Sequence, residues 1–119
     1  SSFIGGGESN EIWASERSTI VSGFASMIIQ SPDSTILNSG PNNGAKILSG
    51  SDQSLAAGGG SLIYDSKNCV ILNTGTIVSK SRNSVIINGT SNEIKHSPYG
   101  TILNGIYNRI HGEAPSKII

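Results

Sequence analysis

Catalysis needs acidic, basic or nucleophilic side chains that converge, and this chain of 119 residues offers few of them. The candidates are His96, His111 and eight acidic residues, among them Asp33, Asp52 and Asp65. A glycan hydrolase or lyase would require two carboxyl groups about 5 to 10 Å apart. Asp52 and Asp65 lie at different points of the sequence repeat described below. We therefore expect that the chain is not an enzyme and has no catalytic residues.

Metal and cofactor chemistry has no stronger support. His96 and His111 lack neighbouring Cys or carboxylate ligands at a recognised spacing. The single cysteine, Cys69, holds a position that serine occupies in other repeats, so we expect a small buried residue there. The glycine runs at 5–7 and 58–60 are not followed by the Lys-Ser or Lys-Thr of a phosphate loop. The sequence thus predicts no metal site and no cofactor.

The aromatic residues are the best candidates for ligand contact. Trp13, Tyr64, Tyr99 and Tyr107 are expected to be exposed, and a planar ring can stack on a sugar face. Trp13 and Tyr64 share one column of the repeat, three units apart, which would separate them by roughly 14 Å along a stack of strands. We take these four residues as candidate glycan contacts. The alternative is that they pack at the rim or against a neighbouring module.

A repeat of 16 residues must position these side chains. One aliphatic column runs through Ile4, Ile20, Ile36, Leu55, Ile71, Ile86, Ile102 and Ile118. A second column runs through Ile12, Ile28, Ile47, Ile63, Val78, Ile94 and Ile110. The two columns share one long step, which places an insertion in residues 38–44, and one short step, which places a deletion between Ile71 and Val78. Self-similarity of this kind indicates a solenoid, in which each unit contacts its neighbours.

Composition indicates strands and turns. The chain has 15 glycines and only 13% charged residues, and its short β-branched runs are bounded by Gly, Asn and Ser. No window has helical spacing of apolar residues over three turns. We therefore predict an all-β fold: a parallel β-solenoid (β-roll or β-helix) of about seven coils with two short strands per coil, forming one domain over residues 1–119.

Asparagine and glycine occupy the predicted turns. Asn88-Gly89 and the equivalent pair at 104–105 follow the first strand of their coils, and both residue types tolerate positive φ. A further column, which includes Asn10, Asn92 and Asn108, marks the entry to the second strand. We expect its amides to bond from coil to coil and to the turn backbone.

The residue after each core position of the first strand points outward, because successive side chains of a strand face opposite sides. This outward column is almost as apolar as the core and contains Val21, Leu37, Leu72, Ile87, Leu103 and Ile119. Soluble monomers rarely expose such a row, and a closed three-fold arrangement would bury three of them. We expect a homotrimer with these six residues at its interface. The outer face of the second strand is expected to be solvated at the two ends of the chain.

The charge and hydropathy of the chain argue against two classes of partner, nucleic acids and membranes. The formal net charge is zero and the eight basic residues are scattered, which argues against nucleic acid. No apolar run of 18 residues and no positively charged leader occur, so we expect no membrane insertion. The absence of an initial Met suggests that the chain is cut from a longer protein.

The repeat Ser-Val-Ile-Ile-Asn-Gly-Thr-Ser-Asn-Glu-Ile, at residues 84–94, resembles the head repeats of trimeric autotransporter adhesins and similar repeats in viral and phage tail-fibre or appendage proteins. The resemblance covers essentially the whole chain. It implies a left-handed parallel β-roll in a trimer, displayed on a virion or an extracellular cell surface, that binds host glycans or matrix. Ile, Leu and Asn replace the Ala and Gly of the bacterial heads, so a viral or phage fibre is at least as good a match.

The function we expect from this resemblance is that of a structural or adhesive segment of a trimeric surface fibre, with host attachment through glycans. A purely mechanical spacer, with the binding tip elsewhere, is the alternative. A glycan-degrading tailspike is a weaker one.

Overall fold

The computed structural model describes residues 1–37, 44–112 and 116–119, and within these ranges the regular structure consists of strands. The chain forms a parallel β-solenoid of about 7 turns, as the repeat predicts. It is a thin slab that measures 36 × 24 × 14 Å along its principal axes. The predicted insertion at residues 38–44 lies almost wholly outside the described ranges.

Two sheets form the broad faces of the slab. The eight-stranded sheet contains β1 (Phe3–Ile4), β4 (Thr19–Val21), β7 (Thr35–Leu37), β9 (Leu55–Ala57), β11 (Val70–Thr74), β13 (Val85–Thr90), β15 (Thr101–Ile102) and β17 (Lys117–Ile118). The seven-stranded sheet contains β3 (Glu11–Trp13), β6 (Met27–Ile29), β8 (Lys46–Leu48), β10 (Leu62–Tyr64), β12 (Ile77–Ser79), β14 (Glu93–Lys95) and β16 (Arg109–His111). A short third sheet pairs β2 (Gly7–Glu8) with β5 (Gly23–Phe24).

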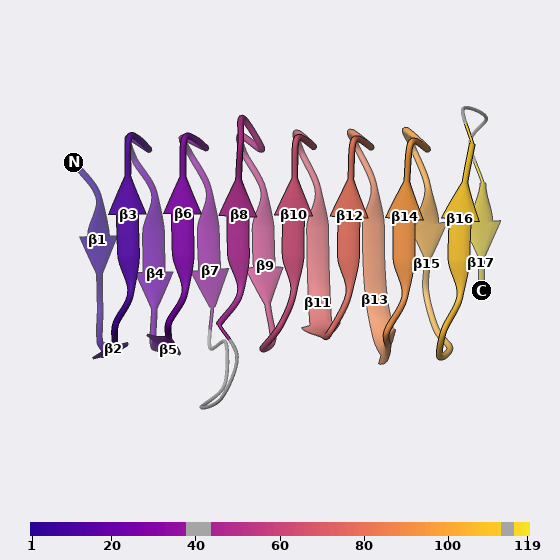
Figure 1. Cartoon of the computed structure of the whole chain (residues 1–119), viewed down its shortest axis with the longest axis horizontal. Coiled ribbons are helices and arrows are strands. Elements are labelled where there is room, and N and C mark those ends of the chain that lie inside the picture. Colours follow the sequence, from indigo (N-terminus) through magenta and orange to yellow (C-terminus); the bar gives the residue numbers. More distant parts are fainter. Residues whose placement is uncertain (38–43, 113–115) are drawn as a thin grey trace.

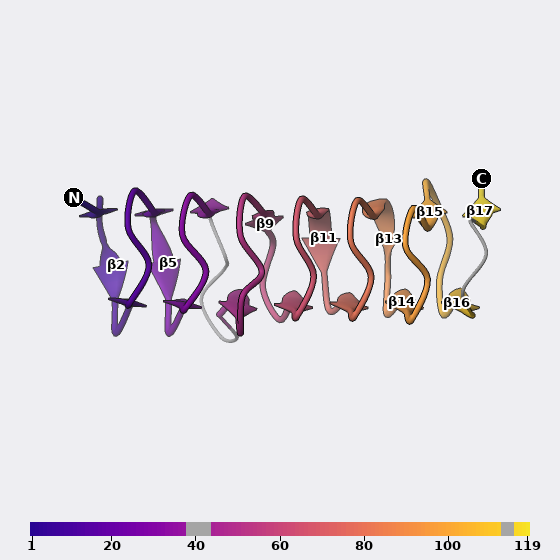
Figure 2. The same ribbon diagram turned by 90° about the horizontal axis from the view of Figure 1, so that it is seen from above.

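The coil is left-handed. In Figure 1 the nearer, seven-stranded sheet runs upward and the more distant, eight-stranded sheet runs downward while the chain advances from left to right. Figure 2 shows the two sheets as separate rows, joined by turns at every coil. Each strand therefore pairs in parallel with the equivalent strands of the preceding and following coils, and side chains at the same repeat position form straight columns.

The core consists of one inward side chain from the middle of each strand, flanked by two outward ones. One sheet contributes Ile20, Ile36, Ala56, Ile71, Ile86 and Ile102, and the other contributes Ile28, Ile47, Ile63, Val78, Ile94 and Ile110. All of these side chains are at most 5% exposed. A single chain therefore encloses its own hydrophobic core.

One position inside the predicted core is wrong, and Ile4, in the first strand of the stack, is 45% exposed instead of buried. Ala56, and not Leu55, pairs with both Ile36 and Ile71, and Leu55 faces outward and is half-buried. The prediction missed a residue added at the corner between β8 and β9, where Gly50 has a φ of 75°. That extra residue moves β9 by one position relative to the repeat, so the small alanine enters the core. The turn before β10 is one residue shorter, and Ile63 keeps its predicted place.

Hydrogen bonds at this corner locate the added residue. In the other coils the corner serine donates to the carbonyl two residues earlier, as Ser66 does to Tyr64 O at 2.7 Å. Ser51 instead donates to Leu48 O, three residues earlier, at the same distance of 2.7 Å. The corner thus absorbs the extra residue while the serine stays in its column.

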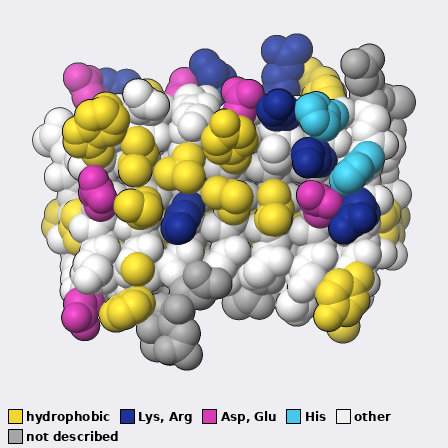
Figure 3. All heavy atoms as spheres, in the orientation of Figure 1, with side chains coloured by type: hydrophobic (Ala, Val, Ile, Leu, Met, Phe, Trp, Pro, Cys, Tyr) yellow, Lys and Arg dark blue, Asp and Glu magenta, His cyan; other side chains and the backbone are white. Residues whose placement is uncertain are grey.

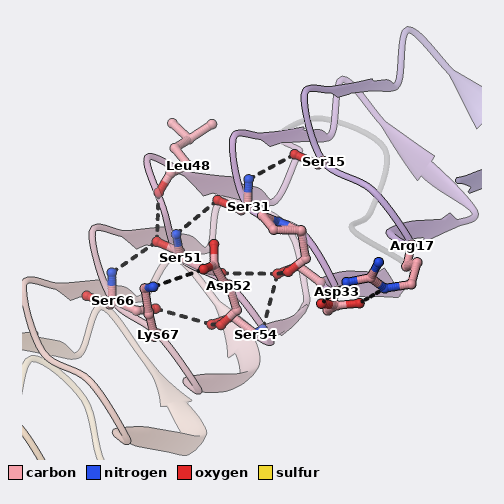
Figure 4. Close-up of polar contacts among 12 residues, drawn as sticks. Ser15, Arg17, Ser31, Asp33, Leu48, Ser51, Asp52, Ser54, Ser66 and Lys67 are labelled. Carbon is pink, nitrogen blue, oxygen red and sulfur yellow. Dashed lines mark hydrogen bonds and ion pairs between the residues drawn. The ribbon is translucent and has the colours of Figure 1, made fainter. Parts of the chain in front are cut away.

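Two buried serine ladders line this corner along the molecule (Figure 4). They come from a Ser-x-x-Ser pattern, as in Ser31-Pro32-Asp33-Ser34, that recurs between the two sheets. In the first ladder, the Oγ of Ser51 accepts from the backbone N–H of Ser66 at 3.1 Å, and Ser66 accepts from Ser81 at 2.9 Å. In the second ladder Ser34 accepts from the N–H of Ser54 at 3.2 Å. The ladders satisfy buried backbone donors that the sheets leave unpaired.

The opposite corner follows the prediction for asparagine and glycine. Asn88 has a φ of 62° and Gly89 a φ of 109°, so the C-terminal part of β13 bends with the positive φ that these residue types tolerate. The Asn92 side chain donates to Gly105 O at 3.0 Å and accepts from the N–H of Asn108 at 3.0 Å. Asparagine amides therefore tie adjacent coils together through the turn backbone.

Candidate functional site

The outer face of the eight-stranded sheet carries the predicted interface residues. All six face outward: Val21, Leu37, Leu72 and Ile87 are each about 40% exposed, Leu103 is half-buried and Ile119 is 81% exposed. The parallel column beside them is also outward and half-buried, and it contains Thr19, Thr35, Leu55, Val70, Val85 and Thr101. From β7 to β15 neither column holds a charged residue. The face is therefore a continuous apolar strip.

The other broad face is more apolar than expected. Figure 3 shows hydrophobic side chains over much of the seven-stranded sheet, and charged ones concentrated near its C-terminal strands. The apolar residues of this face are Trp13, Met27, Ile29, Leu48, Leu62, Tyr64 and Ile77. Lys46 interrupts them in β8. At the C-terminal end the face is polar, as predicted: Glu93 pairs with Arg109 at 2.8 Å and with His111 at 3.1 Å.

The four candidate aromatic residues do not converge on one site. Trp13 and Tyr64 end β3 and β10 in the same column of the seven-stranded sheet, and they are 57% and 40% exposed. Tyr99 lies in the serine corner after β14. Tyr107, 80% exposed, lies in the turn before β16, on the opposite edge of the slab. Trp13 and Tyr64 thus share one face, whereas Tyr99 and Tyr107 lie at opposite edges.

The serine corner forms a cleft that the sequence analysis missed. Asp65, Lys67, Lys80, Arg82 and Pro98 line it, and its volume is about 500 Å³. Successive coils supply these residues at equivalent positions: Lys67 and Arg82 share one column, and Asp65 and Lys80 share another. Aligning the residues beside the serines, and not only the aliphatic columns, would have revealed the group.

The titratable residues of the serine corner are only partly paired. Lys67 Nζ lies 3.0 Å from Asp52 Oδ2, and Arg17 forms two bonds to Asp33 at 2.6 and 2.8 Å. The Arg17 guanidinium lowers the pKa of Asp33 below its usual value, mainly through these hydrogen bonds. Among the ion pairs of the described ranges, none involves Lys80 or Arg82.

Cys69 is buried, as predicted, in the second serine ladder. Its thiol is fully inaccessible and lies 2.9 Å from Ser81 O, and burial raises its pKa to about 11. A thiol in this state is a poor nucleophile at neutral pH. Elsewhere in the part of the chain that the structure describes, no three His, Cys, Asp or Glu residues come together as metal ligands would.

Three surfaces of the solenoid are candidates for a functional role: the apolar strip, the aromatic column and the basic cleft. No family model, curated protein or solved structure matches this chain. The coil geometry therefore has to carry the functional argument by itself. No helix long and apolar enough to cross a membrane occurs in residues 1–37, 44–112 and 116–119.

Proposed function

We propose that this chain is a structural segment of a homotrimeric surface fibre, carried by a virion, a phage appendage or a cell, and that the fibre attaches to host glycans. The observation that carries the proposal is the uncharged apolar strip along the outer face of the eight-stranded sheet. Exposed apolar surface of this extent marks an interaction site. A purely mechanical spacer would use the same strip and lack the glycan contacts.

A second copy of the chain is the partner that fits this strip. The strip is straight and repeats at every coil, so an equally regular surface complements it along its whole length. In a fibre every copy must run in the same direction, which a cyclic arrangement about the long axis provides. With three chains, the eight-stranded sheets become the three inner walls of a prism.

Burial of the strip on assembly would contribute only a limited free energy, because neighbouring coils already cover part of each side chain. Full burial of a Leu, Ile or Val contributes about 1.5 to 3 kcal/mol, so a side chain 40% exposed has roughly 1 kcal/mol left to gain. Five exposed residues of the strip thus offer on the order of 5 kcal/mol per chain. Association itself costs about 4 to 15 kcal/mol. One misplaced charge should therefore separate the chains.

The test is the mass of the native particle, measured by light scattering on a sizing column. We expect three times the chain mass of 12.3 kDa for the unmodified protein. Leu72→Asp and Leu103→Asp should reduce it to one chain, because a buried carboxylate without a partner is strongly unfavourable. Ile106→Asp is the matched control, since Ile106 is 64% exposed but lies in the turn after β15, outside the strip.

The outcomes separate the alternatives. A particle of two chains would refute three-fold symmetry, and a monodisperse monomer of the unmodified protein would refute the fibre assembly altogether. A trimer that survives Leu72→Asp would show that another surface, such as the apolar part of the seven-stranded sheet, holds the chains together.

A further inference from the structure

The basic cleft at the serine corner spans three successive coils. Asp65 and Lys67 follow β10, Lys80 and Arg82 follow β12, and Pro98 follows β14. Its volume of about 500 Å³ lies within the range of small-ligand sites. It is separate from the apolar strip, because the strip covers the outer face of the other sheet. The cleft therefore stays accessible when the strip is buried.

Two cations of the cleft are available to a ligand. The arginines outside the cleft are engaged: Arg17 binds Asp33 at 2.6 Å, and Arg109 binds Glu93 at 2.8 Å. Lys80 and Arg82 take part in no ion pair within the described part of the chain. Figure 3 shows Lys and Arg side chains along this edge, with Asp and Glu side chains between them. Lys80 and Arg82 can therefore bind an anion without first breaking an ion pair.

The turn at this corner repeats its backbone conformation from coil to coil, so the residues of the cleft stand at fixed places along it. Positive φ recurs at the position of Lys80, as in Gln30, and at the position of Tyr99, as in Arg17. The turn therefore accepts charged or aromatic residues at these positions. Tyr99 directly follows the cleft residue Pro98, so it adjoins the cleft.

We propose that this cleft binds a carboxylate-bearing sugar, such as a uronic or sialic acid unit of a host glycan; this deepens the function proposed above and rests on it. Lys80 and Arg82 would bind the carboxylate, with Arg82 able to form two parallel hydrogen bonds. Asp65 would accept hydrogen bonds from sugar hydroxyls. Tyr99, 57% exposed, supplies a ring on which a sugar can stack.

The acidic residues of the corner favour a sugar over a nucleic acid. Asp65 lines the cleft, and Asp52 lies 3.0 Å from Lys67 at its border. A polymer with one phosphate per unit would meet both carboxylates, whereas a sugar chain carries hydroxyls between its charges and can place a hydroxyl there. Tyr64 directly precedes Asp65 and is 40% exposed, so a second ring adjoins the same region.

The experiment measures binding of the assembled protein to four probes by titration calorimetry: polysialic acid, heparin, a single-stranded DNA oligonucleotide and neutral dextran. We expect polysialic acid to bind most tightly and dextran not to bind. The double variant Lys80→Asn and Arg82→Asn should weaken polysialic acid binding at least tenfold. Asparagine suits the φ of residue 80, so this variant should fold at least as well as the unmodified chain.

The matched control is the double variant Lys46→Gln and Lys117→Gln, which removes the same charge from two exposed lysines outside the cleft. Its affinity should stay within twofold. Equal loss in both double variants, or undiminished binding by the cleft variant, would overturn the proposal. If heparin bound more tightly than polysialic acid, the preferred anion would be a sulfate and the proposed carboxylate would be wrong. If DNA bound more tightly than polysialic acid, the ligand would not be a sugar of this kind.

The same samples distinguish this inference from the proposed fibre. A particle of three chains that binds none of the probes would refute the cleft alone. A monomer that binds polysialic acid and loses it in the cleft variant would refute the assembly alone.

Discussion

Replacing Ser66 with alanine tests whether the serine ladder stabilises the solenoid. Ser66 is 1% exposed, donates to Tyr64 O at 2.7 Å and accepts from the N–H of Ser81 at 2.9 Å. The Tyr64 carbonyl keeps another donor, the N–H of Lys80 at 3.0 Å. The N–H of Ser81 loses its partner and remains buried. An orphaned buried donor costs about 1 to 3 kcal/mol, so we expect Ser66→Ala to lower the free energy of unfolding by about 2 kcal/mol.

The loss should be visible in two assays. For a chain of this length the unfolding entropy per residue converts about 2 kcal/mol into a fall of roughly 8 °C in Tm. Native-state hydrogen exchange is more specific, since the Ser81 amide should exchange about thirtyfold faster, while amides several coils away change less. Protein concentration must be held constant, because assembly also shifts Tm.

Two control variants make the Ser66 result decisive. Ser79→Ala alters a half-buried outward serine of β12 and should change the free energy of unfolding by less than about 0.5 kcal/mol. Ser66→Cys should retain most of the stability, because Cys69 already serves in the second ladder, where its sulfur lies 2.9 Å from Ser81 O. If Ser66→Ala were no worse than Ser79→Ala, or if the Ser81 amide exchanged at its normal rate, the ladder would contribute nothing.

Two further predictions concern titrating groups. The folded pKa of Cys69, about 11, is above the ordinary value of 9.0, so its contribution to stability is complete below pH 9 and is lost as the pH rises through 11. Cys69→Ser should remove this alkaline loss in urea titrations, and the unmodified thiol should resist a thiol reagent at neutral pH until the chain unfolds. The pKa of Asp33 is lowered by Arg17, so its contribution is present above the ordinary Asp pKa and is lost as the pH falls through the folded value. Carboxyl NMR should show the Asp33 pKa returning to its usual range in Arg17→Gln, and an unchanged titration would show that the pair does not persist in solution.

Much of the fold was predictable because the same pattern of residue types recurs in every coil. The inward columns, the outward apolar column and the asparagine turns each follow from strand alternation or from residue types that tolerate positive φ. The error at Leu55 has a physical origin: both Leu55 and Ala56 are apolar, so the hydrophobic pattern could not choose between them. Gly50 adds one residue to the corner before β9 and so places Ala56 in the core. A glycine contributes nothing to the hydrophobic pattern, so this shift could not be recognised from it.

The basic cleft could not be predicted from the aliphatic columns. Its residues belong to the exposed positions beside the serines, where the repeat tolerates Glu, Pro, Asp, Lys and Arg. Charge at such positions is recognisable as a group only when these exposed columns are aligned as well, which places Lys67 beside Arg82 and Asp65 beside Lys80. The aromatic candidates failed to converge for a related reason: exposure was correctly expected, but the corner in which each ring lies depends on the register.

The corner that accommodates Gly50 also bears on how such a protein can evolve. Inserting one residue into a compact domain usually disturbs packing on every side. Here the change is confined to one coil. The core residues Ile47 and Ala56 are nine positions apart instead of eight, and Ala56 and Ile63 are seven apart, so the next coil recovers its register. A rod built in this way can gain or lose surface loops by small insertions and deletions while its core stays intact. Its surface can thus diversify without loss of the fold, and foreign peptides could be grafted at the same corners.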